Sequence, residues 1–318
     1  MRAVDDDTRE GVVLTNLDQP LFDGAGATKG DLVDYLDAVS DRIVAVLQGR
    51  PLSVIRARPK QAPFMQKNVP SSAPEWLRTV SRWAESSKRT VAYALCDDRR
   101  SLLWFANQRA VEYHPALVRA DRPDRITHLV LDLDPPEGAP FAAVVTVAHL
   151  VRQALAEVGL AGALKTSGAK GVHVFVPIDD VTPPEDVAAA LRALAVRVER
   201  LDPSVATTAF IKDDRAGKVF VDATRVGGAT VVAAYSPRAR PGVPVSFPLA
   251  WDDLDRVDPR DFTILTAPAL LQGRDPWAAS MPAPQAVPGV LVDEGRAIPV
   301  PRVVAMHEGR RRARARKD

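Results

Sequence analysis

The stretch HLVLDLDP (residues 128–135) combines alternating leucines with two carboxylates and ends in a proline. Successive side chains of a strand point to opposite faces, so the leucines would enter a core while Asp132 and Asp134 project together from the other face. The two aspartates would lie about 7 Å apart along the backbone, and their oxygens could converge on two divalent cations roughly 3.5–4 Å apart. Two solvated aspartates at a strand end would have the same pattern, so the rest of the chain must decide between these interpretations.

The segments from residue 126 onward follow the order strand, helix, strand, strand, helix, strand. They are expected at 126–134, about 140–158, about 163–178 (a strand–turn–strand element), about 184–201, and in a strand pair that contains residues 210–211 and 219–222. This order is typical of a split βαβ sheet, ferredoxin-like or RNA-recognition-motif-like, with helices on one face. We therefore predict an α+β protein in which the other face of this sheet is open for chemistry.

The N-terminal part has weaker patterns. Thr28 and Asp31 resemble a capping box, and apolar residues from Leu32 to Leu47 follow at helical spacing, which predicts one helix. Residues 50–75 show little periodicity and predict an irregular surface, and the Pro- and Ala-rich residues 276–301 predict an extended wrap or linker. We expect a catalytic domain over 1–270 with an N-terminal α/β subdomain to about residue 125 and a catalytic subdomain from about 126. A Pro/Ala-rich extension with a basic tail is expected over 271–318.

Composition sets broad limits on function. The chain has 318 residues, of which 46% are hydrophobic, so it can form a large core. Cys96 is the single cysteine, which excludes an intrachain disulfide and a thiolate metal cluster. No apolar leader or run of membrane-spanning length occurs, so we expect a soluble cytoplasmic protein without a membrane partner. The basic run at 310–317 indicates a disordered tail, attraction to a polyanion, or both.

A second informative segment is LKTSGAKGVHVFV (residues 164–176), a turn between two expected strands. Glycines allow backbone N–H groups to approach an anion closely, and Ser167 and Lys170 could then bind phosphate oxygens. His173 opens the next strand and could reach the same face. The spacing is not that of a P-loop, and a glycine hairpin turn with a solvated lysine is the alternative.

A third carboxylate ends the strand in RAGKVFVD (residues 215–222). If this strand lies beside the first, Asp222 joins the two earlier aspartates in a two-metal site for in-line nucleotidyl transfer. Carboxylate and phosphate oxygens suit Mg²⁺ or Mn²⁺ better than zinc. Arg238 and Arg240 could grip phosphates bidentately, although such a pair taken alone is more often two surface arginines. A lone histidine such as His114 is more often structural than catalytic.

Together these segments resemble the archaeo-eukaryotic primase superfamily. More narrowly, they are similar to the polymerase domain of bacterial ATP-dependent DNA ligase D and its stand-alone actinobacterial relatives. The matching stretches, in order, are LTN (14–16), TKGD (28–31), EYHP (112–115), LDLDP (131–135), TSGAKGVH (166–173), RAGKVFVD (215–222), YSPR (235–238) and WDDL (251–254). The resemblance runs from about residue 12 to about residue 265.

The resemblance implies a template-dependent primase-polymerase that adds NTPs or dNTPs to a primer 3′-hydroxyl with two metal ions, Mn²⁺ being favoured over Mg²⁺ or Co²⁺. It also implies a preference for ribonucleotides. The metal-binding and catalytic residues would be Asp132, Asp134 and Asp222. The nucleotide-binding residues would be Ser167, Gly168, Lys170, His173, Arg225 and Arg238, with His114 at the sugar. The DNA-binding residues would be Asn16 and Lys29 at a downstream 5′-phosphate, together with Phe64, Lys67 and Arg215.

Three positions depart from the family pattern. Gln19 stands where a basic residue is usual near the 5′-phosphate, Met65 replaces a second aromatic next to Phe64, and Arg225 replaces a polar residue. We therefore expect weaker recognition of the 5′-phosphate, one stacking platform fewer, and extra positive charge beside the nucleotide.

The expected partners are DNA with gaps or breaks, NTPs or dNTPs, and a separate DNA ligase or other repair proteins. We expect a monomeric, nucleoid-associated enzyme for gap filling in excision repair or for end joining, without a ligase or nuclease domain of its own. Two alternatives stay open from the residues: a non-catalytic DNA-binding module with a degenerate polymerase site, and a metal-dependent nuclease with three acids.

Overall fold

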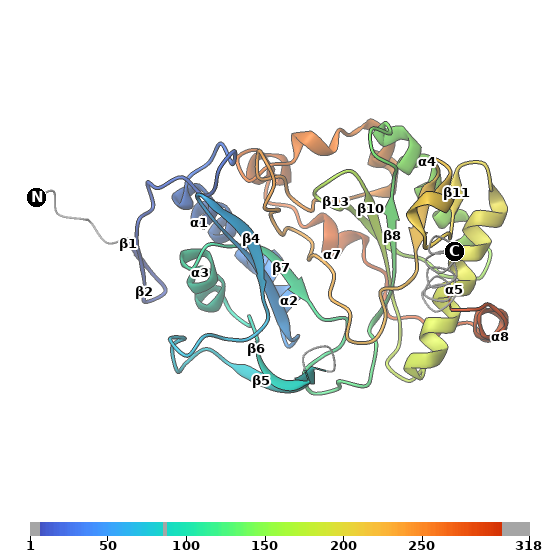
Figure 1. Cartoon of the computed structure of the whole chain (residues 1–318), viewed down its shortest axis with the longest axis horizontal. Coiled ribbons are helices and arrows are strands. Elements are labelled where there is room, and N and C mark those ends of the chain that lie inside the picture. The colour runs from blue at the N-terminus through green and yellow to red at the C-terminus, as the bar shows by residue number, and fades with distance from the viewer. Residues whose placement is uncertain (1–6, 85–87, 301–318) are drawn as a thin grey trace, which may run out of the picture.

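Two β-sheets, each with its own helices, lie along the long axis of the molecule (Figure 1). The computed structural model describes residues 7–84 and 88–300. The first sheet has the strand order β4-β3-β6-β5, with β7 also paired to β3, and a two-stranded ribbon of β1 and β2 precedes it. The elements of this N-terminal half are β1 Asp7–Arg9, β2 Val12–Leu14, α1 Lys29–Ala38, α2 Ser40–Leu47, β3 Leu52–Arg58, β4 Gln61–Gln66, β5 Thr79–Ala84, β6 Arg89–Ala94, α3 Arg99–Asn107 and β7 Ala110–Pro115.

The apolar face predicted after Thr28 is confirmed, but the structure has two helices there where one was predicted. Thr28 caps α1 with a reciprocal capping box to Asp31, and the apolar residues that define the face are buried. The helix breaks at Val39, which has φ −106° and ψ 10°, and α2 starts at the next residue. Because Val39 itself is buried, the break redirects the chain without exposing the apolar face.

The expected irregular surface at residues 50–75 was a wrong prediction, since this segment contains β3 and β4. Leu52, Val54 and Ala57 of β3 are buried in the middle of the first sheet. Strand β4 is exposed along nearly its whole length, so it lacks the alternation of apolar and polar residues that reveals a strand in sequence.

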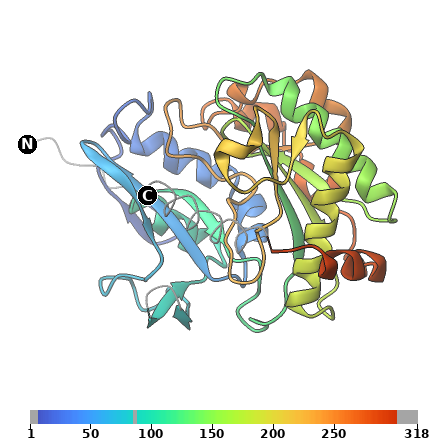
Figure 2. The same ribbon diagram turned by 45° about the vertical axis from the view of Figure 1, so that its right-hand side comes forward.

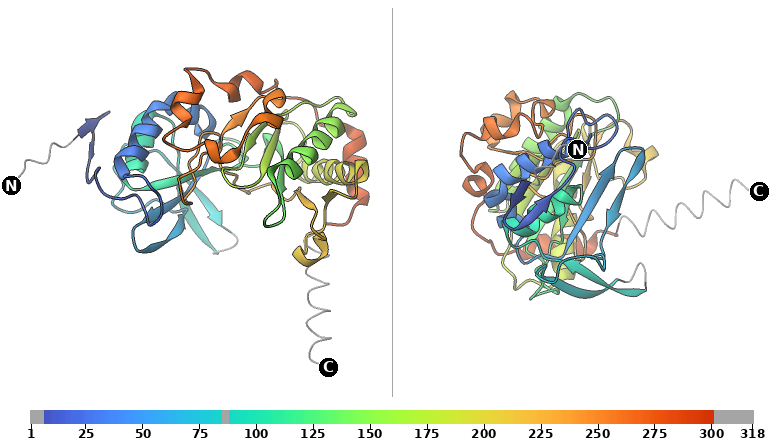
Figure 3. Two further views of the ribbon diagram at one scale, coloured as in Figure 1. Left: turned by 90° about the horizontal axis from the view of Figure 1, so that it is seen from above. Right: turned by 90° about the vertical axis from the view of Figure 1, so that its left-hand side faces the viewer.

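The second sheet has the order β11-β12-β8-β10-β9-β13 and matches the predicted split βαβ arrangement. Helices α4 and α5 cover one face of this sheet, and its other face looks toward the N-terminal half (Figures 1 and 3). The elements of this half are β8 His128–Asp134, α4 Phe141–Ala156, β9 Ala163–Thr166, β10 Val172–Pro177, α5 Pro184–Leu201, β11 Ala206–Thr207, β12 Val219–Asp222, β13 Pro248–Leu249, α6 Ala267–Leu271, α7 Pro276–Ser280 and α8 Gly289–Ala297, with short 3₁₀ turns at Lys212–Arg215, Trp251–Arg256 and Pro259–Asp261.

The predicted strand at residues 210–211 is absent. Strand β12 pairs instead with β11, which runs parallel to it, and the chain between them turns through the 3₁₀ segment at Lys212–Arg215. Phe210 packs edge-on against Phe220 with ring centroids 6.5 Å apart, so its apolar character serves this contact rather than a strand.

The expected extended wrap at residues 276–301 was also wrong, because α7 and α8 lie there. Figure 2 shows α8 beside α5. A Cβ atom at Gly295 would lie 1.8 Å from Ala189 O, so glycine is needed for this close packing, and Arg197 adds two hydrogen bonds to Glu294 of 2.9 and 2.5 Å. The basic run at 310–317 lies outside the described residues, and the domain boundaries stay a prediction.

No helix among the described residues has the length and apolar character that crossing a membrane requires.

The His128 imidazole should make folding sensitive to mild acid. Burial, together with the nearby Arg50, lowers the pKa of His128 from 6.5 to about 3. The unfolded chain therefore binds the proton first, and the free energy of unfolding should fall as the pH drops from about 6.5 toward 3. In urea titrations, His128→Asn should show a shallower loss of stability over this range and a constant offset from the wild type above pH 7. Equal slopes in the two proteins would contradict this assignment.

Candidate active site

Strand register brings the three predicted carboxylates to the open face of the second sheet. Asp222 of β12 is the direct partner of Asp132 on β8, and His173 of β10 is the partner of Asp132 on its other side. Asp134 lies two residues further along β8 and shares the face of Asp132, while the intervening leucine is buried under the helices. The alternation predicted from HLVLDLDP is therefore confirmed.

These side chains surround a cavity of about 480 Å³, which lies in the usual range for ligand pockets of roughly 300–1,000 Å³. Nine of the residues predicted to bind metal or nucleotide line it together. They are His114, Asp132, Asp134, Ser167, Lys170, His173, Asp222, Arg225 and Arg238. Arg215, expected along the DNA, lines the same cavity, and so does Arg240.

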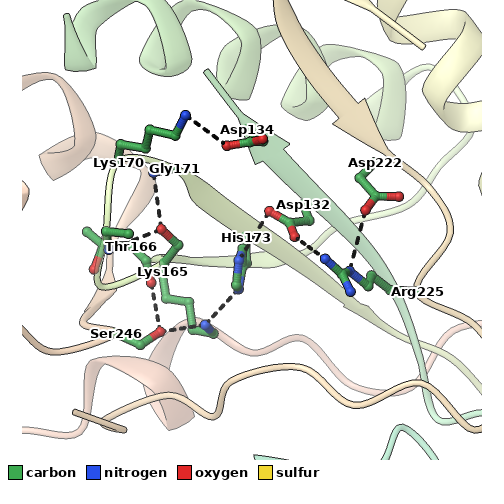
Figure 4. A network of polar contacts seen from close by, with 12 residues as sticks. Asp132, Asp134, Lys165, Thr166, Lys170, Gly171, His173, Asp222, Arg225 and Ser246 are labelled. Atoms are coloured by element: carbon green, nitrogen blue, oxygen red, sulfur yellow. Dashed lines mark hydrogen bonds and ion pairs between the residues drawn. The ribbon is translucent and has the colours of Figure 1, made fainter. Parts of the chain in front are cut away.

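Basic side chains accompany each carboxylate (Figure 4). Asp132 lies 3.3 Å from His173 Nε2 and accepts a 3.0 Å hydrogen bond from Arg225 Nη2. Burial alone would raise the pKa of Asp132, but His173 and Arg225 outweigh it and hold this pKa well below its ordinary value. Asp134 lies 3.4 Å from both Lys170 Nζ and Arg215 Nη1.

The two carboxylate oxygens of Asp222 have different partners. Oδ1 accepts hydrogen bonds from the backbone N–H and the hydroxyl of Thr224, at 2.8 and 2.6 Å, and Oδ2 lies 3.5 Å from Arg225 Nε. In residues 7–84 and 88–300, no group of three or more His, Cys, Asp or Glu side chains is gathered closely enough to hold a metal ion. The donors nevertheless suit a hard divalent cation, because three carboxylates share one face and one cavity. Each of them lies against a basic side chain.

The turn between β9 and β10 spends two of its backbone N–H groups on its own serine, so the predicted approach of these groups to an anion is not what the turn shows. Ser167 Oγ accepts hydrogen bonds from the N–H groups of Ala169 (3.2 Å) and Gly171 (3.1 Å), so its own proton can still be donated to a ligand. Gly168 has φ +66°, and a Cβ there would lie 2.6 Å from Arg238 Cγ. The glycines are therefore required by packing against this chain's own atoms, a reason that the sequence did not reveal.

Gly171→Ala should destabilise this turn, because its Cβ would lie 2.3 Å from Leu133 O on β8. Overpacking against a strand backbone typically costs about 1–3 kcal/mol. Urea unfolding should show a loss of that size, with weaker nucleotide binding. Gly228→Ala is the matched control, since no atom lies within 4 Å of its added Cβ. A Gly171→Ala protein as stable as this control would show that the turn can relax.

A buried basic network lies behind His173, on the side away from Asp132, and no sequence motif singles out its lysine. Lys165 is fully buried, with Nζ 2.9 Å from His173 Nδ1 and 2.6 Å from Ser246 Oγ. Burial lowers the pKa of Lys165 well below its ordinary range and that of His173 to about 4. His173 is therefore neutral near pH 7, and the network fixes the orientation of its ring beside Asp132.

Glu112 joins two predicted nucleotide-binding residues that are far apart in the chain. Its Oε2 lies 2.9 Å from His114 Nε2 and 3.0 Å from Arg238 Nε, and its Oε1 accepts the N–H of Ala239 at 2.9 Å. Burial would raise the pKa of Glu112, but His114 and Arg238 lower it below the ordinary value. The sequence contains a signal for this contact. Glu112 precedes His114 by two residues, so the two side chains share one face of β7.

The predicted DNA-binding residues at the N-terminus lie away from this cavity. Phe64 is exposed on β4, 5.8 Å under the guanidinium of Arg56, and Lys67 follows in the exposed chain after the strand. Lys29 is almost fully buried and donates hydrogen bonds to Thr15 O and to Asn107 Oδ1 (2.6 Å). These residues are thus separate from the carboxylates, as a long nucleic acid would require.

Arg109 is a further basic residue of this region, and no motif in the sequence singles it out. Its Nη2 donates a 2.8 Å hydrogen bond to Gln19 Oε1, and Gln19 in turn donates to Asn16 Oδ1 at 3.3 Å. A guanidinium therefore stands next to the position where the family pattern has a basic residue. Burial, together with Arg109, lowers the pKa of Lys29 to about 8.

The sequence matches the family model of the LigD primase-polymerase domain over residues 28–277. The chain belongs to this family. LigD primase-polymerase domains are metal-dependent nucleotidyltransferases, which agrees with the carboxylates that share one face of the second sheet.

Curated and solved relatives agree with this assignment. The chain is 35% identical over 259 residues to the multifunctional non-homologous end joining DNA repair protein LigD of Mycobacterium tuberculosis, covering 78% of this chain and 34% of that protein. It is 29% identical over 260 residues to the bifunctional non-homologous end joining protein LigD of Bacillus subtilis, covering 80% and 41%. The chain thus spans well under half the length of these curated relatives.

A solved structure confirms the fold. The polymerase domain of Mycobacterium tuberculosis ligase D in complex with DNA superposes with a TM-score of 0.77 at 32% identity, covering 87% of this chain and all of that one. The α+β architecture predicted from the order of strands and helices is therefore that of a LigD polymerase domain.

Proposed function

We propose that this protein is a template-dependent primase-polymerase that joins an NTP or dNTP to a primer 3′-hydroxyl at short gaps or breaks in DNA. The observation that carries the proposal is the common cavity. Asp132 and Asp222 face each other across paired strands, and the Ser167 turn and Arg238 line the same space. Carboxylates for cations and donors for phosphates are what nucleotidyl transfer requires side by side.

The cofactor would be a pair of divalent cations held by Asp132, Asp134 and Asp222, and oxygen ligands of this kind suit Mn²⁺ or Mg²⁺. Bound there, such ions lower the pKa of an attacking hydroxyl and stabilise the charge of a leaving pyrophosphate. His173 would keep Asp132 oriented, since Lys165 and Ser246 hold the imidazole from the other side.

The incoming nucleotide would be held by the turn and by the arginine opposite it. Ser167 would donate its hydroxyl proton to a phosphate oxygen, and Lys170 and Arg238 would neutralise the triphosphate. His114, fixed by Glu112, would contact the ribose and favour ribonucleotides. Because Glu112 also binds Arg238, contacts to the sugar and to the phosphates would be adjusted together.

DNA would run from this cavity over the N-terminal half. The exposed Phe64 and Lys67 would contact the template or the downstream strand, and Asn16, Lys29 and Arg109 would bind a downstream 5′-phosphate. The solved relative was captured with DNA, which supports such a partner. The named relatives act in non-homologous end joining, so we propose end joining or excision-repair gap filling, by a monomer with a separate ligase.

Replacement of both Asp132 and Asp134 by Asn should abolish nucleotide incorporation and leave DNA binding intact, because the isosteric amides cannot bind cations as carboxylates do. The assay is extension of a one-nucleotide-gapped duplex with NTPs or dNTPs in Mn²⁺, Mg²⁺ or Co²⁺, with fluorescence anisotropy for DNA binding. Asp255→Asn, a surface change beside His149, should behave as wild type.

Three results would overturn the proposal. Full activity in the double variant would exclude these carboxylates as metal ligands. DNA binding by the wild type without extension in any metal would favour a non-catalytic module. Shortening of end-labelled DNA would indicate a nuclease.

Arg109→Gln should reduce the stimulation of extension by a downstream 5′-phosphate roughly threefold to tenfold, as expected for one lost contact to a charged group of about 1 kcal/mol. The measurement is the ratio of extension rates on gaps with and without the phosphate, which cancels effects on catalysis. In the wild type this ratio should fall as the pH rises past about 8, because Lys29 then loses its proton.

Arg119→Gln is the matched control, because it removes the same charge from a half-exposed arginine outside the catalytic cavity. An unchanged ratio in Arg109→Gln would remove Arg109 from the phosphate site.

A further inference from the structure

We propose that Arg225 is a built-in counter-cation of the catalytic carboxylates, occupying the space between Asp132 and Asp222 until a metal–nucleotide complex displaces it. The inference rests on the proposed function and adds to it a residue that couples metal binding to nucleotide binding. It predicts that the protein alone binds divalent cations weakly and that a nucleotide strengthens this binding.

The geometry places one guanidinium against two facing carboxylates (Figure 4). Arg225 Nη2 donates to Asp132 Oδ2 at 3.0 Å, and Arg225 Nε lies 3.5 Å from Asp222 Oδ2. Asp132 and Asp222 are direct partners in the strand pairing, so a cation shared by them would need this space. Arg225 Nε is buried without a hydrogen-bond partner in the described part of the chain, so its contact with Asp222 is one of charge alone.

The two cations that pair with Asp134 have additional anchors. Lys170 Nζ donates a 2.6 Å hydrogen bond to Pro135 O, and the Arg215 guanidinium stacks 3.8 Å from the centre of the Phe220 ring. Both lie 3.4 Å from Asp134, at the outer end of the strand. The polar contacts of Arg225 in residues 7–84 and 88–300 go to Asp132 and Asp222, so a competing cation would release it fully.

The loop that carries Arg225 can let it move without moving Asp222. Thr224 holds Asp222 Oδ1 through two hydrogen bonds, whereas Gly227 and Gly228 follow Arg225 and have open space around them. The Arg225 side chain is 40% exposed and lines the same cavity as the Ser167 turn. When it leaves the carboxylates, it can therefore turn toward a triphosphate bound in that cavity.

The charge of Arg225 couples the binding of a divalent cation to the binding of a nucleotide. A divalent cation alone must break two ion pairs and leave a guanidinium without a partner beside it. A nucleotide that brings phosphate oxygens supplies that partner, so metal and nucleotide should each strengthen the binding of the other by the same factor.

The test compares Mn²⁺ binding to the full chain, without DNA or nucleotide, by isothermal titration calorimetry and by the EPR signal of free Mn²⁺. Arg225→Gln should bind Mn²⁺ at least about tenfold more tightly than the wild type, and Arg225→Lys should stay within about threefold of the wild type. Arg240→Gln removes the same charge from the same cavity and should also change the affinity less than about threefold.

Two further measurements separate this inference from the proposed function. A non-hydrolysable NTP analogue should tighten Mn²⁺ binding more in the wild type than in Arg225→Gln. The Mn²⁺-induced rise in melting temperature should be larger in Arg225→Gln, which also shows that the variant is folded. An equal or weaker Mn²⁺ affinity in Arg225→Gln overturns the inference, whereas a protein that never extends DNA but shows the tenfold difference retains it and loses the polymerase assignment.

Discussion

The antiparallel pairing of β12 with β8 sets Asp222 opposite Asp132, and the rest of the cavity is arranged around this register. In the same pairing Val221 lies opposite Leu133, and both are buried on the side covered by α4 and α5. Because side chains alternate along each strand, a slip of one residue would expose the valine and bury the carboxylate. Apolar burial on one face therefore fixes the position of the acids on the other.

Charge on the open face is balanced within the protein itself. Three carboxylates in one cavity would repel one another, and Lys170, Arg215 and Arg225 offset this repulsion. The same cations make the cavity a place where phosphates can be bound. Glu112 on β7 forms an ion pair with Arg238, so it joins the N-terminal half to the segment that carries this arginine. The cavity therefore combines residues from both halves.

Several elements could be predicted because their signals are local. The alternation of leucine and aspartate in residues 128–134 identified β8 and its two faces, and proline and apolar spacing located α4 and α5 within a few residues. The capping box at Thr28 marked the start of α1. Other elements gave no local signal: β4 is exposed along nearly its whole length, and the helix break at Val39 keeps the apolar spacing on both sides.

The sequence by itself determined which residue types were available for chemistry and, through the ordered motifs, the family and the carboxylate set. Tertiary structure decided what each group contacts. Lys165 behind His173, Glu112 between His114 and Arg238, and the guanidinium of Arg225 between two aspartates all depend on segments brought together by packing. Periodicity records which face of an element is buried, but it carries no information on which distant side chain lies across from it.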